Sequence, residues 1–416
     1  MLSSLPRTRA IVLIIQGNRL RGETVVRPEP DRGRRRAVAV LVAIGVLIVA
    51  AGSAVTFRGP VAPVPAAPQV LLAPGDGATG VVPAAPIHVE ARGGTLTDVT
   101  LTADDGTSIP GTLSRDGRTW TASAAPAYAT TYRFAGSATN DGGTVPVTGS
   151  FTAADPDQLV RASTSIGDGA VVGIAAPIDI RFDRPIAVAD RAGIERRLKV
   201  RTTVPVEGAW AWLPDSDRGS RVHWRPATYW PSGTGVTVEV GLYGRDLGAA
   251  GFGAADLSST FTIGRSQIVR ADVRSHRMVV IRDGKQVANM PATFGLESDR
   301  RRVTRGGTHI VMGKSPTVLM SAFDYVDVPM HWAVRISNNG EFIHANPASS
   351  YAHGRQNVTH GCVNLSTANA RSYYDSVLYG DPVEVIGSSV PLSAADGDIY
   401  DWTIPWEQWK TMSARP

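Results

Sequence analysis

One uncharged apolar run, residues 37–57, divides this chain of 416 residues into two unequal parts. The run follows directly after three arginines at 34–36. As a helix it would span about 31 Å, enough to cross the hydrocarbon core of a membrane. Because cytoplasmic flanks are enriched in Lys and Arg, residues 1–36 are predicted to form a basic cytoplasmic tail. Everything after about residue 58 would then lie outside the cell membrane.

The same run could instead be the core of a cleaved secretory signal, because AAGSA at 50–54 offers small residues to a signal peptidase. We favour an uncleaved anchor, since the run exceeds the roughly 7–15 residues of a signal core and the tail before it is long. Either interpretation exports the rest of the chain.

The charge of the chain is concentrated at its N-terminus. The formal net charge is +5, but residues 1–36 alone hold nine arginines and three acids, so the remainder is nearly neutral. A broad phosphate-binding face is therefore not expected, and we predict no nucleic-acid partner. A single cysteine also excludes an intramolecular disulfide framework and a cysteine-rich zinc module.

Short alternating apolar and polar runs, separated by Gly, Asp and Pro, follow a proline-rich linker at 58–69. This pattern predicts two immunoglobulin-like β-sandwich domains, at 70–155 and 156–264. A Gly-Asp-Gly-Ala sequence begins near the start of each, at Gly75 and at Gly167. It could suggest calcium loops, but the full set of oxygen ligands is missing, so we interpret both as turns. The dense tryptophans of 208–230 could contact sugar, although strand alternation favours core packing.

A third β-rich module, 265–388, opens with a predicted hairpin whose turn contains Asp283-Gly284. The chain then ends in a tryptophan-rich extension, 389–416. We expect Trp402, Trp406 and Trp409 to form an apolar clasp onto this third module, since the last two lie one helical turn apart.

The only cysteine lies in Thr-His-Gly-Cys-Val-Asn, within a segment (340–374) that also holds three histidines. An isolated cysteine is usually core filler, but Gly361 permits a tight turn beside Cys362. His344 follows an apolar strand and could return beside the thiol, drawing off its proton to give a thiolate–imidazolium pair. Backbone N–H groups around His360, Gly361 and Cys362 could then hold an oxyanion. Such residues suit acyl transfer through a thioester.

Zinc is the competing interpretation for His344, His353, His360 and Cys362. Their spacing lacks a common Cys-x-x-Cys or His-x-x-x-His frame, so we predict neither a metal nor any other cofactor. His353 is interpreted as a loop residue, whereas His309 and His331 on predicted strands are interpreted as ordinary pocket or core histidines.

His344, a gap of fifteen residues, and then His360-Gly361-Cys362-Val363-Asn364 resembles the motif of the YkuD-type L,D-transpeptidase family. The resemblance extends from about residue 266 to 386 and into the tail, and the two preceding β modules with one anchor resemble actinobacterial members. It implies a β-rich catalytic domain outside the membrane that remodels peptidoglycan without a cofactor. The substrates implied are a donor tetrapeptide stem, which loses its terminal D-Ala, and an acceptor stem, joined as a 3→3 crosslink.

By motif position, the resemblance implies that Cys362 is the nucleophile and His344 its general base and acid, oriented by the carbonyl of Ala345. His360 and Gly361 would shape the cysteine turn and oxyanion site, and Asn364 would fix substrate and loop.

The resemblance also implies a substrate-facing tyrosine on a flap, for which Tyr325 is the nearest match, and a substrate strand along Asn339 and Gly340. The stretch 344–348 lacks an aromatic residue that some relatives place after the histidine. Carbapenem β-lactams are expected to be covalent inhibitors.

Three other functions remain open. Water as acceptor would make the protein an L,D-carboxypeptidase, and a protein lysine as acceptor would make it attach proteins to the wall. A non-catalytic wall-binding protein would use the sandwiches alone, but the intact histidine–cysteine set argues against that function.

Overall fold

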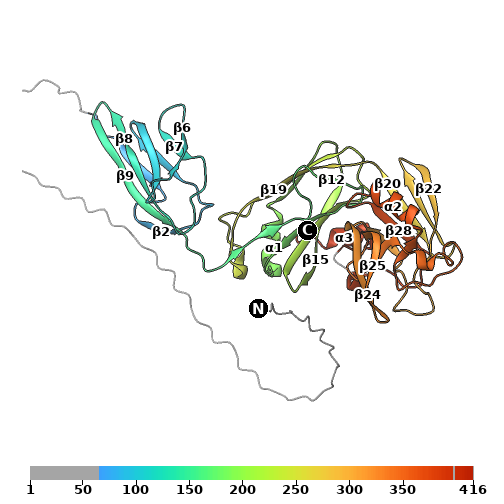
Figure 1. Cartoon of the computed structure of the whole chain (residues 1–416). Helices are drawn as coiled ribbons and strands as arrows, with labels where there is room; N and C mark the ends of the chain where they lie inside the picture. The colour runs from blue at the N-terminus through green and yellow to red at the C-terminus, as the bar shows by residue number, and fades with distance from the viewer. Residues whose placement is uncertain (1–64, 397–398, 416) are drawn as a thin grey trace, which may run out of the picture. The chain divides into compact units, whose positions relative to one another are not determined.

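The computed structural model describes residues 65–396 and 399–415. The basic tail, the apolar run at 37–57 and most of the proline-rich linker lie outside these residues. Within the described ranges, no helix combines the length and the apolar character that a membrane span needs. The described chain is mainly β (Figure 1), as its alternating pattern predicts.

The first β-sandwich follows the linker and encloses its own core, which includes Val89, Leu101, Trp120, Phe134 and Phe151. Its nine strands form two sheets, of four and five strands. In sheet order they are β1 (Gln69–Ala73), β3 (His88–Arg92), β7 (Thr119–Ala122) and β6 (Gly111–Leu113), and then β2 (Ala78–Val81), β9 (Gly143–Ala153), β8 (Thr131–Asn140), β4 (Thr95–Ala103) and β5 (Ser108–Ile109).

The second β-sandwich has two four-stranded sheets, a short strand pair and one helix. In sheet order these are β11 (Ala162–Ser163), β13 (Ile178–Phe182), β16 (Gly219–Pro226) and β15 (Gly208–Ser216), then β12 (Val171–Val172), β19 (Leu257–Ile263), β17 (Gly235–Val240) and β14 (Leu198–Thr202), with β10 (Leu159–Val160), β18 (Phe252–Gly253), the turn η1 (Gly248–Ala250) and helix α1 (Val188–Glu195). Trp210, Trp212, Trp224 and Trp230 belong to the buried core, so packing and not sugar contact explains them.

The repeated Gly-Asp-Gly-Ala sequence forms the same turn in both sandwiches. The Asp76 carboxylate accepts the backbone N–H of Ser150 on β9 at 2.8 Å, and the Asp168 carboxylate accepts that of Thr260 on β19 at 2.9 Å. Gly77 (φ +71°) and Gly169 (φ +72°) both adopt the left-handed region that favours glycine. Each aspartate therefore ties a turn to a neighbouring strand, which confirms the turn interpretation.

The third module contains two sheets and a helix. The first sheet has the order β22 (Lys285–Pro291), β21 (Arg277–Arg282), β20 (Gln267–Asp272), β28 (Pro382–Ile386) and β23 (Gly307–Ile310). The second has the order β24 (Gly313–Ala322), β25 (Tyr325–Arg335), β26 (Phe342–Ala345) and β27 (Val363–Leu365), and it packs against helix α2 (Thr367–Ser376) beside the turn η2 (Pro347–Ser349). The β21–β22 turn is the predicted hairpin, since Asp283 and Gly284 both have positive φ.

The C-terminal extension contains the turns η3 (Ala394–Asp396) and η4 (Asp401–Thr403) and helix α3 (Trp406–Thr411). The prediction that the three tryptophans clasp the third module is wrong, because the tail packs mainly against the second sandwich. Trp409, 0% exposed, packs with Ala211 and Leu213 of β15, and its Nε1 donates to the Ala209 carbonyl at 2.9 Å. Only Trp402 borders the third module, in a small cluster with Ile310.

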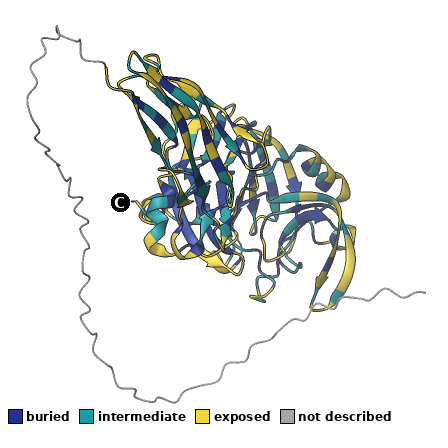
Figure 2. Ribbon diagram, turned by 90° about the vertical axis from the view of Figure 1, so that its left-hand side faces the viewer, coloured by how far each residue is buried: buried dark blue, intermediate teal, exposed yellow. Residues whose placement is uncertain are grey.

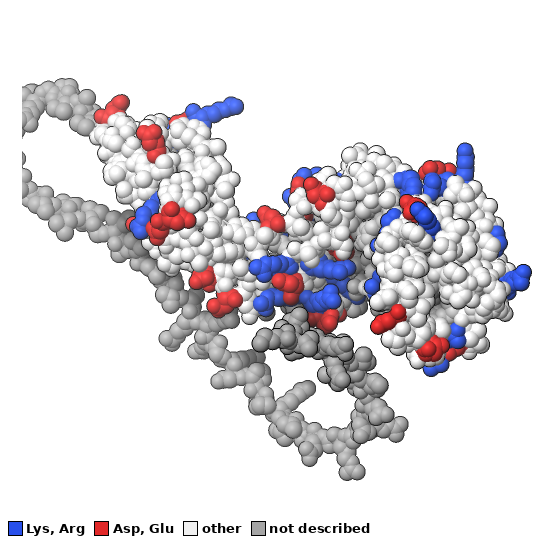
Figure 3. Space-filling view, viewed as in Figure 1, with Lys and Arg blue, Asp and Glu red and all other residues white. Residues whose placement is uncertain are grey.

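This packing has a simple physical cause. Every residue of β16 is buried, which is unusual for a sheet with one face toward solvent. Its inner face belongs to the sandwich core, and the tail covers its outer face, where Arg225 stacks on the rings of Trp402, Trp406 and Trp409. Figure 2 shows dark blue, buried segments alternating with teal and yellow ones along the strands. Both charge signs occur over the described surface in Figure 3.

Candidate active site

Two parallel strands bring the chemically important side chains together. β26 and β27 pair so that Ile343 faces Val363 and His344 faces Asn364, with Cys362 directly before β27. A cavity of about 360 Å³ is lined by both strands and by the β24–β25 hairpin. Its residues are Tyr325, Val328, Met330, His344, Asn346, Ala348, Ser349, Tyr351, Val358, Thr359, His360, Cys362 and Asn364. The cysteine and histidine predicted to react together therefore share one cavity.

The His344 imidazole is held in one tautomer. It is 2% exposed, and its Nδ1 lies 2.9 Å from the Ala345 carbonyl oxygen. A carbonyl oxygen can only accept, so Nδ1 carries the proton and Nε2 keeps a lone pair for proton uptake. The contact expected of the Ala345 carbonyl is present, and an alanine side chain there is no obstacle because the backbone makes the contact.

The turn before the cysteine is fixed by two threonine hydroxyls. The Thr304 hydroxyl donates to the Gly361 carbonyl at 2.8 Å, and the Thr359 hydroxyl donates to the Cys362 carbonyl at 2.6 Å. Gly361 has φ +120°, where an L-residue is strained. The Gly361 N–H donates to the Thr359 hydroxyl at 3.2 Å, so it is already engaged. Of the three backbone donors expected for an oxyanion, this one is not free in the resting site.

The thiol and imidazole rest as a neutral pair. Burial raises the pKa of the Cys362 thiol to about 12, with the nearby Glu341 carboxylate acting in the same direction and the Phe342 N–H opposing it. Burial lowers the pKa of His344 to about 4, against a smaller opposite effect of the Ala345 carbonyl. Both shifts favour the uncharged forms near pH 7, whereas the sequence suggests a resting thiolate–imidazolium pair. Burial of both groups is the reason, because desolvation disfavours each charged form.

This neutral pair has a measurable consequence. The rate of Cys362 alkylation by iodoacetamide is expected to rise steadily from pH 7 to pH 10 without a plateau, because the thiolate fraction keeps growing below the thiol pKa. Cys362 is the only cysteine, so total incorporation reports on this site alone. The same protein in guanidinium chloride is the control and should level off above about pH 9, near the ordinary cysteine pKa. A plateau near pH 7 in the folded protein would contradict a neutral pair.

His360 is bound to the β24–β25 hairpin. Its Nε2 lies 3.0 Å from the Asp324 carboxylate. The rings of Phe323 and Tyr325 meet the imidazole edge-on, with distances between ring centroids of 5.1 and 5.4 Å. The hairpin turn is thus attached to the residue two before the nucleophile. Tyr325 lines the cavity, in the wall where the sequence places a substrate-facing tyrosine.

The other expected substrate residues differ in position. The Gly340 carbonyl lies 3.7 Å from the Cys362 Sγ, whereas Asn339 turns away from the cavity and bonds to Asp396. Asn364 is buried in the cavity wall, and its amide donates to the Ser349 hydroxyl at 3.3 Å. The structure therefore brings Gly340 and Asn364 to the thiol but not the side chain of Asn339.

Sequence reasoning missed part of the cavity wall. Residues 344–348 contribute no Phe, Tyr or Trp to the cavity wall, but Tyr351, 62% exposed, does. Val328 and Met330 come from the hairpin, where strand alternation could have indicated them. Tyr351 lies beyond the turn η2, and no short-range pattern identifies the side chain that such a loop returns to the cavity.

The other histidines considered in the sequence, His309, His331 and His353, do not line this cavity. His353 bonds to the Ser349 hydroxyl, and His331 bonds to the Thr317 hydroxyl on the hairpin. His309 is fully buried. Among residues 65–396 and 399–415, no group of three or more His, Cys, Asp or Glu side chains is arranged to hold a metal ion.

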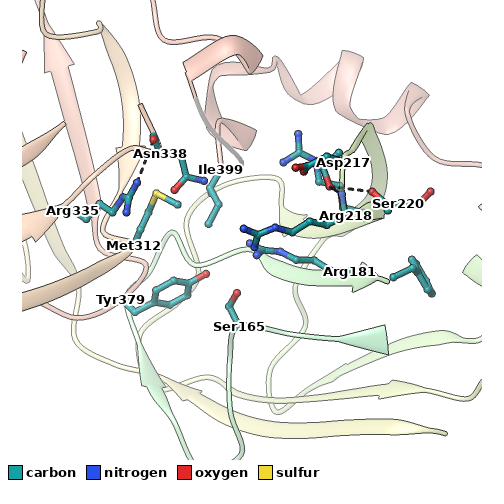
Figure 4. A pocket seen from close by; sticks show the side chains of 14 residues that line it. Ser165, Arg181, Asp217, Arg218, Ser220, Met312, Arg335, Asn338, Tyr379 and Ile399 are labelled. Atoms are coloured by element: carbon teal, nitrogen blue, oxygen red, sulfur yellow. Dashed lines mark hydrogen bonds between the residues drawn. The ribbon is translucent and has the colours of Figure 1, made fainter. Parts of the chain in front are cut away.

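A larger cavity, about 680 Å³, lies away from Cys362 (Figure 4). Arg181, Arg218, Ser165 and Ser220 of the second sandwich line it together with Tyr379 and other residues of the third module. It contains neither cysteine nor histidine. Reactive chemistry, not cavity size, therefore identifies the smaller cavity as the candidate active site.

Fold and site together define a class: mainly β proteins in which immunoglobulin-like sandwiches precede a module whose cysteine and histidine share a cavity. Residues 266–385 match the L,D-transpeptidase catalytic domain family (YkuD), and residues 78–246 match the bacterial Ig domain family. The chain is 48% identical to L,D-transpeptidase 5 of Mycobacterium tuberculosis (strain ATCC 25618 / H37Rv), over 92% of this chain and 86% of that protein. It therefore belongs to the L,D-transpeptidase family and is an enzyme of this class, as the motif predicts.

A second relative agrees with this assignment. L,D-transpeptidase 2 of Mycobacterium tuberculosis (strain CDC 1551 / Oshkosh) is 37% identical, over 84% of this chain and 85% of that protein. Among solved structures, L,D-transpeptidase LdtMt1 in complex with imipenem is 33% identical, over 55% of this chain and 99% of that chain, with a TM-score of 0.46.

Proposed function

We propose that this enzyme forms 3→3 crosslinks in peptidoglycan through a thioester on Cys362. The observation that supports the proposal most directly is that the only cysteine shares a cavity with a neutral histidine whose Nε2 is free to take a proton. The donor is a tetrapeptide stem whose third residue is a diaminopimelate and whose fourth is D-Ala. We assign Cys362 as the nucleophile and His344 as its base and acid.

In the first half-reaction, the Cys362 Sγ attacks the carbonyl carbon of the third donor residue as its proton moves to His344 Nε2. Because the resting pair is neutral, proton transfer and attack are coupled, and no stable thiolate precedes them. The His360 and Cys362 N–H groups stabilise the oxyanion, and the Gly361 N–H joins them only if the Thr359 hydroxyl releases it. The tetrahedral intermediate then breaks its C–N bond, His344 gives the proton to the amine, and D-Ala leaves.

In the second half-reaction, the side-chain amine of a diaminopimelate on the acceptor stem attacks the thioester carbon. His344 takes a proton from the amine, the C–S bond breaks, and the proton returns to Sγ. One amide bond is thus exchanged for another, and no cofactor or oxidant is needed. We assign the side chains of Tyr325 and Tyr351, which line the cavity, and the Gly340 carbonyl beside the thiol to binding of the donor stem.

We also propose that the apolar run at 37–57 anchors the protein, with residues after about 58 facing the cell wall. The two sandwiches would then act as a spacer between membrane and active site. The charge distribution supports this orientation, since the arginine-rich tail precedes the run and the remainder is nearly neutral.

Incubation of the full-length protein with a disaccharide-tetrapeptide tests the reaction. Mass spectrometry is expected to show free D-Ala and a crosslinked dimer that lacks one D-Ala. A disaccharide-tripeptide offered alone is the control, because it has no terminal D-Ala to release and should remain monomeric. Tripeptide product without dimer would replace the proposal with L,D-carboxypeptidase activity. Release of D-Ala only when a lysine-bearing wall protein is added would instead indicate protein attachment.

A further inference from the structure

A second buried histidine lies behind the turn that carries Cys362. His309 on β23 is 0% exposed, and its Nε2 lies 2.7 Å from the carbonyl oxygen of Arg305. Its Nδ1 lies 3.2 Å from the carbonyl oxygen of Ile336. Carbonyl oxygens accept hydrogen bonds and never donate them, so each ring nitrogen is placed to donate, and only the doubly protonated ring can donate to both.

The Glu341 carboxyl group faces this ring. One oxygen of its buried carboxylate, Oε2, lies 3.8 Å from His309 Nδ1 and has no hydrogen-bond partner among the described residues. The other, Oε1, accepts the backbone N–H of Arg305 at 2.8 Å. The remaining charges nearby are already paired, since the Arg305 guanidinium contacts the Asp396 carboxylate at 3.0 Å. Of these side chains, His309 is therefore the one that faces the unpartnered oxygen.

Glu341 lies next to two glycines that neighbour Cys362, namely Gly340 and Gly361. Glu341 directly follows Gly340, whose carbonyl lies 3.7 Å from the Cys362 Sγ. A Cβ atom at Gly361 would lie 3.6 Å from Cγ and 3.8 Å from Oε1 of Glu341, so the carboxylate side chain passes beneath the cysteine turn. The negative charge of Glu341 acts to raise the pKa of the Cys362 thiol.

We propose that His309 and Glu341 are positioning residues for the nucleophile: a doubly protonated His309 pairs with the Glu341 carboxylate and cancels a negative charge beside the cysteine turn. The inference rests on the proposed role of Cys362. Without the imidazolium, the Glu341 carboxylate would oppose the negative charge that develops on Sγ during attack. Without the carboxylate, the imidazolium would favour that charge but lose its own partner.

The charge of His309 can be measured directly. We expect ¹⁵N NMR of the full-length protein, labelled at histidine nitrogens, to show both nitrogens of His309 protonated at pH 7. His309→Gln identifies the signals by removing them. A single protonated nitrogen at pH 7 would overturn the ion pair. This measurement involves no turnover, so it stands apart from whether the proposed crosslinking reaction occurs.

The electrostatic effect is tested by alkylation of Cys362 with iodoacetamide across a pH series. Glu341→Gln is expected to raise the alkylation rate at pH 8 about threefold, and His309→Gln to lower it about threefold. A change of about one unit in the thiol pKa changes the thiolate fraction about tenfold, but a thiolate of lower pKa is a weaker nucleophile, which offsets part of the change in rate. The double variant should return close to the wild-type rate. Glu384→Gln on β28, whose carboxylate bonds to Tyr229 and Arg270, is the matched control and should change nothing.

A merely structural role would give a different result, because both single variants would then change the rate in the same direction and the double variant would be no better. Circular dichroism identifies any variant that does not fold, and in that case the NMR measurement on the wild-type protein decides. If the wild-type protein fails to release D-Ala while the alkylation rates follow the expected pattern, the proposed reaction fails and the ion pair stands.

Discussion

Replacing Cys362 by alanine is expected to abolish D-Ala release and dimer formation, with a loss of at least about 10³-fold in rate. The physical reason is that the first half-reaction needs a nucleophile able to form an acyl bond, and the chain contains no other cysteine. The same variant should take up no carbapenem, because ring opening of a β-lactam by a thiol requires Sγ. Product analysis gives the first result, and intact mass after carbapenem exposure gives the second.

The matched control for this variant is Cys362→Ser, which keeps a hydroxyl of similar size in the same turn. A hydroxyl is far less acidic than a thiol, so His344 cannot activate it as readily, and activity should stay far below that of the wild type. Undiminished D-Ala release from Cys362→Ala would remove every thiol mechanism for this enzyme. Carbapenem uptake by Cys362→Ala at the wild-type level would place the acylated residue elsewhere.

Several residues that share the cavity could be predicted because they lie close together in the sequence. Cys362, Gly361 and Asn364 occupy one turn and strand, and His344 precedes them by a short connection. Parallel pairing of β26 and β27 then places His344 opposite Asn364. The orienting role of the Ala345 carbonyl is local for the same reason, since it involves adjacent residues.

The charge state of the site could not be predicted in the same way. A nearby histidine and cysteine suggest an ion pair, but burial decides whether either group ionises, and burial depends on the whole fold. The Thr359 hydroxyl that occupies the Gly361 N–H likewise follows from the turn geometry and not from the motif. His309 lies on β23 and Glu341 directly before β26, 32 positions later, so no spacing pattern links them.

The β-sandwich pattern was also readable, because strand alternation and turn residues act over a few positions. The surface against which the C-terminal tail packs could not be predicted. Tryptophans one helical turn apart indicate an apolar helix face, but many apolar surfaces could receive it. The outer face of β15 offers Ala209 and Ala211 as a shallow apolar surface, a feature visible only once the strand pairing is known.

Trp409→Ala is expected to lower the free energy of unfolding of the second sandwich by about 3–5 kcal/mol, the range found when buried aromatic side chains are truncated. The indole is fully buried, its Nε1 donates to the Ala209 carbonyl, and its ring stacks under the Arg225 guanidinium. The variant therefore leaves a cavity and removes one partner each from the Ala209 carbonyl and the Arg225 guanidinium. Burial already lowers the pKa of Arg225 to about 10, with the Asp401 charge opposing the change.

Trp406→Ala is the matched control, because Trp406 lies on the same helix and is only half-buried, with its Nε1 bonded to the Glu207 carboxylate at 3.3 Å. Its expected cost is below about 1.5 kcal/mol. Hydrogen exchange measured by mass spectrometry is the suitable method, since a chain of several domains does not unfold in one step. Faster exchange in β15, β16 and α3 for Trp409→Ala, with little change for Trp406→Ala, is the expected result. Equal protection of β15 and β16 in both variants would show that the tail does not stabilise the second sandwich, because the outer face of β16 would then be stable without its cover.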